Sequence, residues 1–122
     1  VELSPGDKNG EALMTCFVTL PLSECEALID RAVVDGSITG EQLDRYEVRQ
    51  PGCGGCVVLV YEKHYYRAGN RLTLTVTLDD LTGKTRVHTV SGGGGEGLFR
   101  FDWGASERFE AVVDEALEQY RA

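Results

Sequence analysis

One segment near the middle of the chain alternates aliphatic residues with threonine without a break. Leu72, Leu74, Val76 and Leu78 alternate with Thr73, Thr75 and Thr77. Because successive side chains of a β-strand point to opposite faces, this pattern predicts a strand with one buried face and one hydroxyl-bearing face. Antiparallel sheets commonly pack one face on a core and leave the other in water. The rest of the chain must therefore cover the aliphatic face.

Two amphipathic helices are predicted to supply that cover. The first opens at Ser23, with Glu26 completing a capping box, and stops at Gly36. Its apolar positions recur at helical spacing and are Cys25, Leu28, Ile29, Ala32 and Val33. The second helix follows an N-cap at Asp102 or Ser106. Its apolar stripe is formed by Phe109, Val112, Val113, Ala116, Leu117 and Tyr120.

Between Tyr46 and Ser91 the apolar period is two, which indicates strands. The predicted strands cover residues 16–20, 57–67, 72–78 and 85–91, and residues 98–101 form a fifth strand or cross back over the sheet. This order predicts an α+β two-layer sandwich, β-α-β-β-β-(β)-α. A curled antiparallel sheet of four to five strands carries both helices on one face.

The length and composition suit one domain, residues 14–122, after a flexible N-terminal arm at residues 1–13. Hydrophobic residues make up 42% of the 122 residues, which is enough for a core. The net charge of -8 disfavours nucleic acid and anionic membrane surfaces as partners. No apolar run approaches the length that spans a bilayer, and no secretory signal is visible, so we expect a cytoplasmic protein.

A glycine run before the C-terminal helix is the strongest candidate for a binding site. Residues 92–95 and Gly97 are glycines, and the aromatic run that follows ends at Trp103. Because glycine reaches φ > 0 without steric cost, the main chain here can approach a ligand closely. A phosphate-binding loop would place its glycines directly before a helix, whereas residues 98–103 intervene here. The predicted ligand-binding residues are Gly93, Gly94, Gly95, Gly97, Asp102, Trp103, Ser106, His64 and Tyr66.

The two histidines support a second hypothesis, acid–base or metal chemistry. His64 shares a strand face with Glu62 and Tyr66, and His88 lies on the strand after next, so the histidines meet if the sheet order allows. A small enzyme would use His64 or His88 as general base, oriented by Asp102. A partly solvated strand end accounts for the same residues without any chemistry.

Cys53-Gly54-Gly55-Cys56 matches the C-x-x-C pattern of metal and redox sites. A redox dithiol needs its first cysteine at a helix N-terminus, whereas this motif follows Pro51-Gly52 and leads into a strand. A structural zinc site needs four ligands at recognisable spacing, which the chain does not offer. We therefore interpret the motif as a glycine-rich hairpin turn. Cys16 and Cys25 fit apolar patterns and are expected to be buried.

Three segments, residues 35–40, 61–67 and 92–106, resemble the bacterial domain of unknown function 6054. The resemblance covers about residues 15–118, and Phe101-Asp102-Trp103-Gly104-Ala105 is its most specific part. It implies a small, single-domain, cytoplasmic bacterial protein and carries over no catalytic residue. Cys53 and Cys56 are peculiar to this chain, which weighs further against the metal and redox hypotheses.

Taken together, these patterns favour binding over catalysis. We expect the partner to be a small-molecule ligand or a second copy of the chain, with no cofactor and no bound metal. The alternatives are the histidine enzyme and a metal or redox protein that uses Cys53 and Cys56.

Overall fold

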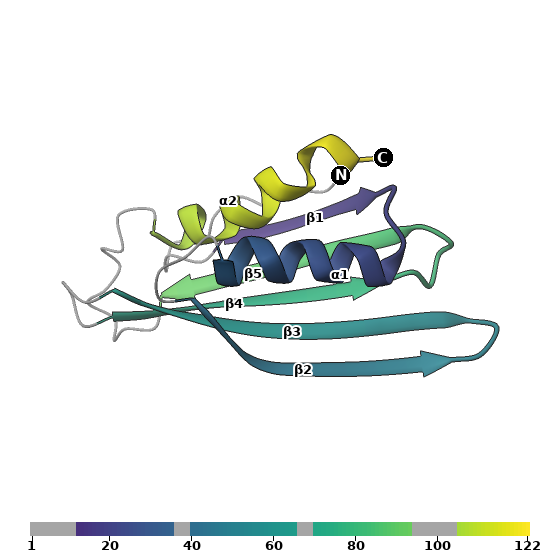
Figure 1. Ribbon diagram of the computed structural model, residues 1–122, viewed down its shortest axis with the longest axis horizontal. Helices are drawn as coiled ribbons and strands as arrows, with labels where there is room; N and C mark the ends of the chain where they lie inside the picture. The colour runs from purple at the N-terminus through teal and green to yellow at the C-terminus, as the bar shows by residue number, and fades with distance from the viewer. Residues whose placement is uncertain (1–11, 36–39, 66–69, 94–104) are drawn as a thin grey trace.

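The computed structural model describes residues 12–35, 40–65, 70–93 and 105–122, which contain five strands and two α-helices (Figure 1). The strands are β1 (Ala12–Val18), β2 (Glu41–Gln50), β3 (Gly54–Tyr65), β4 (Asn70–Asp79) and β5 (Thr85–Gly93). The helices are α1 (Leu22–Asp30), extended by the π-helical turn η1 (Arg31–Asp35), and α2 (Ala105–Leu117), extended by the 3-10 turn η3 (Glu118–Tyr120).

All five strands form one antiparallel sheet in the order β1-β5-β4-β3-β2. Strands β2 to β5 pair with their neighbours in the sequence. In contrast, β1 pairs with β5, with Ala12 opposite Ser91 and Val18 opposite Thr85. The strand with the Leu/Thr alternation, β4, therefore lies at the centre, and β1 and β2 are the two edges.

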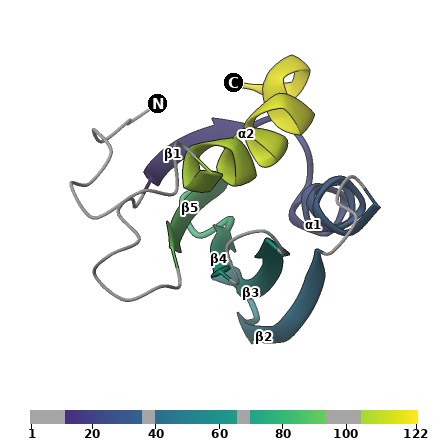
Figure 2. The same ribbon diagram turned by 90° about the vertical axis from the view of Figure 1, so that its left-hand side faces the viewer.

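Both helices lie on the same side of the sheet, which bends around them (Figure 2). Helix α2 packs on β5, β4 and β1, and α1 contacts α2 and β4. The predicted two-layer α+β fold, with two helices on one face of an antiparallel sheet, is confirmed.

The aliphatic face of β4 forms the centre of the core, as predicted. Leu74, Val76 and Leu78 are fully buried, whereas Thr73 on the other face is exposed. From α2, Val113 and Leu117 are also fully buried. The other buried hydrophobic residues are Met14, Cys16, Val18, Leu22, Cys25, Ile29, Val33, Val57, Leu59, Tyr61, Leu72 and Val87.

The start of α1 differs from the prediction. The N-cap is Pro21 and no side chain caps the helix, so the predicted Ser23–Glu26 capping box is wrong. The helix begins one residue earlier because Leu22 is part of the core, and the backbone N–H of Cys25 donates to Pro21 O at 2.9 Å. Glu26 instead pairs with Arg45 on the sheet.

The sequence pattern does not predict β2, a strand of ten residues that lies between α1 and β3 in the structure. Its side chains are almost all exposed, so it lacks the buried alternation that identifies the other strands. In addition, β1 begins at Ala12 rather than at residue 16. The fifth strand predicted at residues 98–101 lies outside the described residues.

Candidate functional site

Most of the predicted ligand-binding residues fall outside the part of the chain that the structure describes. These are Gly94, Gly95, Gly97, Asp102, Trp103 and Tyr66. The backbone is described for Gly93 in β5, His64 in β3 and Ser106 in α2. Gly93 pairs with Leu72 and His64 pairs with Arg71, so β3 and β5 reach the same end of the sheet. A ligand site formed by the glycine run stays a prediction.

The two histidines do not come together. His88 pairs with Thr77 on β4, whereas His64 pairs with Arg71, six residues away along the same strand. At about 3.4 Å per residue this separation is about 20 Å. The condition under which the histidines would approach each other is therefore not met, because the register of β4 holds them at different levels of the sheet. Thr15 Oγ1 and His88 Nδ1 share a hydrogen bond of 2.7 Å, and His88 is exposed. The pairing of either histidine with Asp102 stays a prediction.

The C-x-x-C motif forms the hairpin between β2 and β3, as predicted. Gly52 and Gly54 adopt φ of 82° and 119°, which closes the turn. Cys53 is exposed and Cys56 half-buried, and both are free thiols. Cys53 lies in the turn and Cys56 near the start of β3, so neither is at a helix N-terminus. Within the described ranges, no group of three or more His, Cys, Asp or Glu side chains is arranged to hold a metal ion.

The other two cysteines belong to the core, as expected from their apolar positions. Cys16 and Cys25 are fully buried. Burial raises the pKa of both thiols, and that of Cys25 reaches about 12. Because the thiolate is the reactive form, these two cysteines are unreactive in the folded protein.

A hollow of about 490 Å³ lies between the β1–α1 connection and the β4–β5 turn. Asp80 and Lys84 are the charged side chains among its described lining residues, which include no histidine or cysteine. Asp80 already accepts the backbone N–H of Gly55 at 2.8 Å. This hydrogen bond ties Asp80 to the β2–β3 hairpin.

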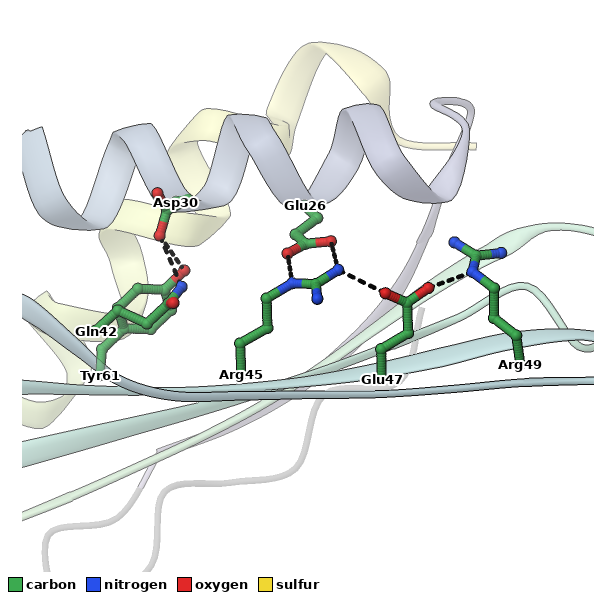
Figure 3. A network of polar contacts seen from close by, with 7 residues as sticks. All are labelled: Glu26, Asp30, Gln42, Arg45, Glu47, Arg49 and Tyr61. Atoms are coloured by element: carbon green, nitrogen blue, oxygen red, sulfur yellow. Dashed lines mark hydrogen bonds and ion pairs between the residues drawn. The ribbon is translucent and has the colours of Figure 1, made fainter.

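A partly buried hydrogen-bond cluster, which the sequence did not suggest, ties α1 to β3 and β2 (Figure 3). The hydroxyl of Tyr61, a fully buried residue, donates to Asp30 Oδ1 at 3.0 Å, and Gln42 Nε2 donates to the same oxygen at 2.9 Å. Burial raises the pKa of Tyr61, and the adjacent Asp30 carboxylate adds to this shift. The phenol therefore stays neutral and acts as a hydrogen-bond donor that fixes the end of α1 over the sheet.

A ladder of alternating charges continues from this cluster along β2 (Figure 3). Arg45 binds both carboxylate oxygens of Glu26 on α1, and its Nη2 contacts Glu47 Oε1 at 2.7 Å. Glu47 also binds Arg49. Hydrogen bonds from Arg45 and Arg49 lower the pKa of Glu47. These three side chains of β2 point toward the helices, because Arg45 and Glu47 lie opposite the buried residues Leu59 and Val57 of β3.

The other side of β2 carries exposed hydrophobic side chains. Tyr46 is 62% exposed and Val48 50% exposed, and their register with β3 directs both away from the helices. Leu43, at the irregularity in register between Gln42 and Asp44, is also 50% exposed. Leu43, Tyr46 and Val48, together with the backbone edge of the strand that faces away from β3, are called the β2 edge below.

The two edges of the sheet differ in their cover. At β1, Val18 pairs with Arg121, Thr19 N–H donates to Tyr120 O at 2.7 Å, and Ala122 N–H donates to Phe17 O at 3.0 Å. The C-terminal segment therefore occupies part of that edge. No described segment pairs with the outer side of β2, which ends the strand order. Unpaired strand edges of this length are templates for pairing with another strand.

A family model for DUF6054, a family of unknown function, matches residues 12–121 of the chain. The chain belongs to this family. The match spans nearly all of the sequence, so membership in DUF6054 applies to the whole described fold, including both helices and β2. No curated protein and no solved structure gives a significant match. None of the helices within the described residues is long and apolar enough to cross a membrane.

Proposed function

We propose that this DUF6054 member is a non-catalytic binding module that associates with a second copy of itself through the β2 edge. The observation that carries this proposal is the distribution of exposed hydrophobic side chains. Four large ones are exposed among the described residues, and three of them, Leu43, Tyr46 and Val48, belong to one edge strand. A single exposed apolar residue is ordinary, but a group on a strand edge is typical of an interaction surface.

The backbone of β2 supports the same conclusion. This strand is ten residues long, and the only strand it pairs with in the described fold is β3. An added strand would receive main-chain hydrogen bonds along this edge and side-chain contacts from Tyr46 and Val48. Between the two partners expected from the sequence, a ligand and a second copy, the described residues favour the second copy.

Sedimentation velocity over a wide concentration range tests this proposal. We expect the chain to shift from monomer to dimer as its concentration rises. Tyr46→Glu should weaken the dimer by about tenfold or more, equivalent to about 1.4 kcal/mol, because it puts a charge on the apolar contact. Leu81→Glu is the matched control, since Leu81 is 53% exposed on the β4–β5 turn and the charge change is the same. A monomer at every concentration, or equal effects of the two substitutions, would contradict the proposal.

A further inference from the structure

We infer that two copies pair through antiparallel β2 strands in a register centred on Tyr46, an arrangement that rests on the proposed self-association. The pairing would join two five-stranded sheets into one continuous sheet with all helices on the same side. Three features of β2 lead to this register: the order of its charges, its length and the position of its aromatic residue.

The charges along β2 restrict which residue can lie at the centre. In an antiparallel pair related by twofold symmetry, the residue on the axis faces its own copy. A centre at Asp44, Arg45 or Glu47 would therefore place like charges opposite each other, which destabilises strand pairing. Of the four central residues, 44–47, only Tyr46 is uncharged.

A centre at Tyr46 places Arg45 of each copy opposite Glu47 of the other. Both side chains point toward the helices, where Arg45 already contacts Glu26 and Glu47 of its own chain (Figure 3). A guanidinium group has five N–H donors, so Arg45 can bind a further carboxylate. The charge ladder of one copy would thus continue into the ladder of the other.

Two other registers, centred on Leu43 and on Val48, also have an uncharged residue on the axis. The length of β2 distinguishes the register centred on Tyr46 from both. A centre at Tyr46 pairs residues 42–50 of both copies, nearly all of β2. The pairs of residues 44–48 lie in the regular part of the strand, and those of residues 42 and 43 cross the irregularity between Gln42 and Asp44. A centre at Val48 also brings Glu47 opposite Arg49 but pairs only residues 46–50, and a centre at Leu43 pairs only residues 41–45. Each lost pair of residues removes backbone hydrogen bonds from the interface.

On the helix-free face, the same register brings the two Tyr46 rings side by side at the twofold axis. Tyr46 is the most exposed of the large hydrophobic residues described, so this contact removes the largest exposed apolar side chain from water. Aromatic pairs directly opposite each other are among the stabilising cross-strand contacts.

Cysteine cross-linking tests the register. Tyr46→Cys and Val48→Cys are introduced separately into a Cys53→Ser/Cys56→Ser background, and each protein is treated with oxidised glutathione as the oxidant. Directly opposite residues of antiparallel strands have Cα atoms about 4.5–5.5 Å apart, within the range of a disulfide. We expect Tyr46→Cys to form a covalent dimer roughly tenfold faster than Val48→Cys, because pairing holds its thiols at a high effective concentration. In this register the two copies of position 48 are about 14 Å apart, because they are offset by four residues along adjacent strands.

The outcomes distinguish this inference from the proposed function. Faster cross-linking of Val48→Cys would overturn the register centred on Tyr46 and leave self-association through β2 intact. If both cysteine variants still sediment as dimers but cross-link equally slowly, the β2 pairing itself is overturned. If the natural chain stays monomeric in sedimentation and neither variant cross-links, the inference and the proposed function are overturned together. Circular dichroism of each variant checks that the fold is retained.

Discussion

At the scale of single residues, Gly54 fixes how the β2–β3 hairpin meets the β4–β5 turn. Its φ of +119° is unfavourable for other residues, and a Cβ there would lie 2.6 Å from Asp80 Oδ1. That oxygen accepts the N–H of Gly55, while the N–H of Asp80 donates back to Gly55 O at 3.2 Å. Gly52, in the same hairpin, has φ of +82° but no atom within 4 Å of its Cβ position.

This difference predicts unequal effects of alanine at the two glycines. Gly52→Ala should cost about 1 kcal/mol of the free energy of unfolding, from backbone strain alone. Gly54→Ala should cost about 2–3 kcal/mol, because it also displaces Asp80 and breaks the hydrogen bond to Gly55. Chemical denaturation of both variants measures the difference. Equal costs would mean that the contact with Asp80 contributes nothing to stability.

The sequence was informative about single residues where local backbone chemistry decides the conformation. The hairpin at Cys53-Gly54-Gly55-Cys56 and the burial of Cys16 and Cys25 follow from glycine content and apolar pattern. The contact between Tyr61 and Asp30 could not be predicted, because it joins two elements 31 residues apart and neither residue stands out in its own segment.

At the scale of elements, α1 and β2 are held together by charges rather than by an apolar interface. Glu26, Arg45, Glu47 and Arg49 form the ladder between them, and β2 contributes no residue to the buried core. For this reason, the sequence pattern does not predict β2 as a strand. Hydrophobic periodicity identifies strands that bury one face, and the side chains of β2 are nearly all exposed. The charged residues that interrupt the apolar pattern of β2 are the same residues that form its ion pairs.

The ladder predicts a dependence of stability on pH. In the folded protein the hydrogen bonds from Arg45 and Arg49 lower the pKa of Glu47 from its ordinary value of 4.5. A carboxylate with a lowered folded pKa stabilises the fold above its unfolded pKa, and the contribution is lost as the pH falls through the folded value. Glu47→Gln should therefore be less stable than the natural protein at pH 7, and the difference should shrink once the pH falls below about 4.5.

Thermal unfolding of both proteins across this range measures the difference, at concentrations low enough to keep them monomeric. Glu41→Gln serves as the control, because it removes a carboxylate from the same strand outside the ladder. A difference between Glu47→Gln and the natural protein that is unchanged at low pH would show that the ion pairs do not stabilise the fold.

At the scale of the whole molecule, the two layers were predictable and the strand order was not. The alternation in β4 and the apolar stripes of the two helices each specify a buried face, and an antiparallel sheet with helices on one side satisfies all of them. The pairing of β1 with β5 brings together segments about seventy residues apart, with Thr15 opposite His88, and no local pattern specifies it. The C-terminal segment then reaches back to β1, where Arg121 pairs with Val18.

The helices and the sheet share one hydrophobic core, and Leu117 is the helix residue that tests this. Leu117 is the final residue of α2 and is fully buried, so it joins the end of the chain to the core formed by the sheet. Leu117→Ala should lower the free energy of unfolding by about 2–5 kcal/mol, through lost burial and the cavity left behind. Glu115→Ala, an exposed change in the same helix, should alter the free energy of unfolding by no more than about 0.5 kcal/mol.

Chemical denaturation of Leu117→Ala measures this loss of stability. The dimer affinity of the variant should be unchanged under native conditions, because Leu117 belongs to the helix layer and the β2 edge lies on the far side of the sheet. An unchanged denaturation midpoint would mean that α2 does not share the core of the sheet.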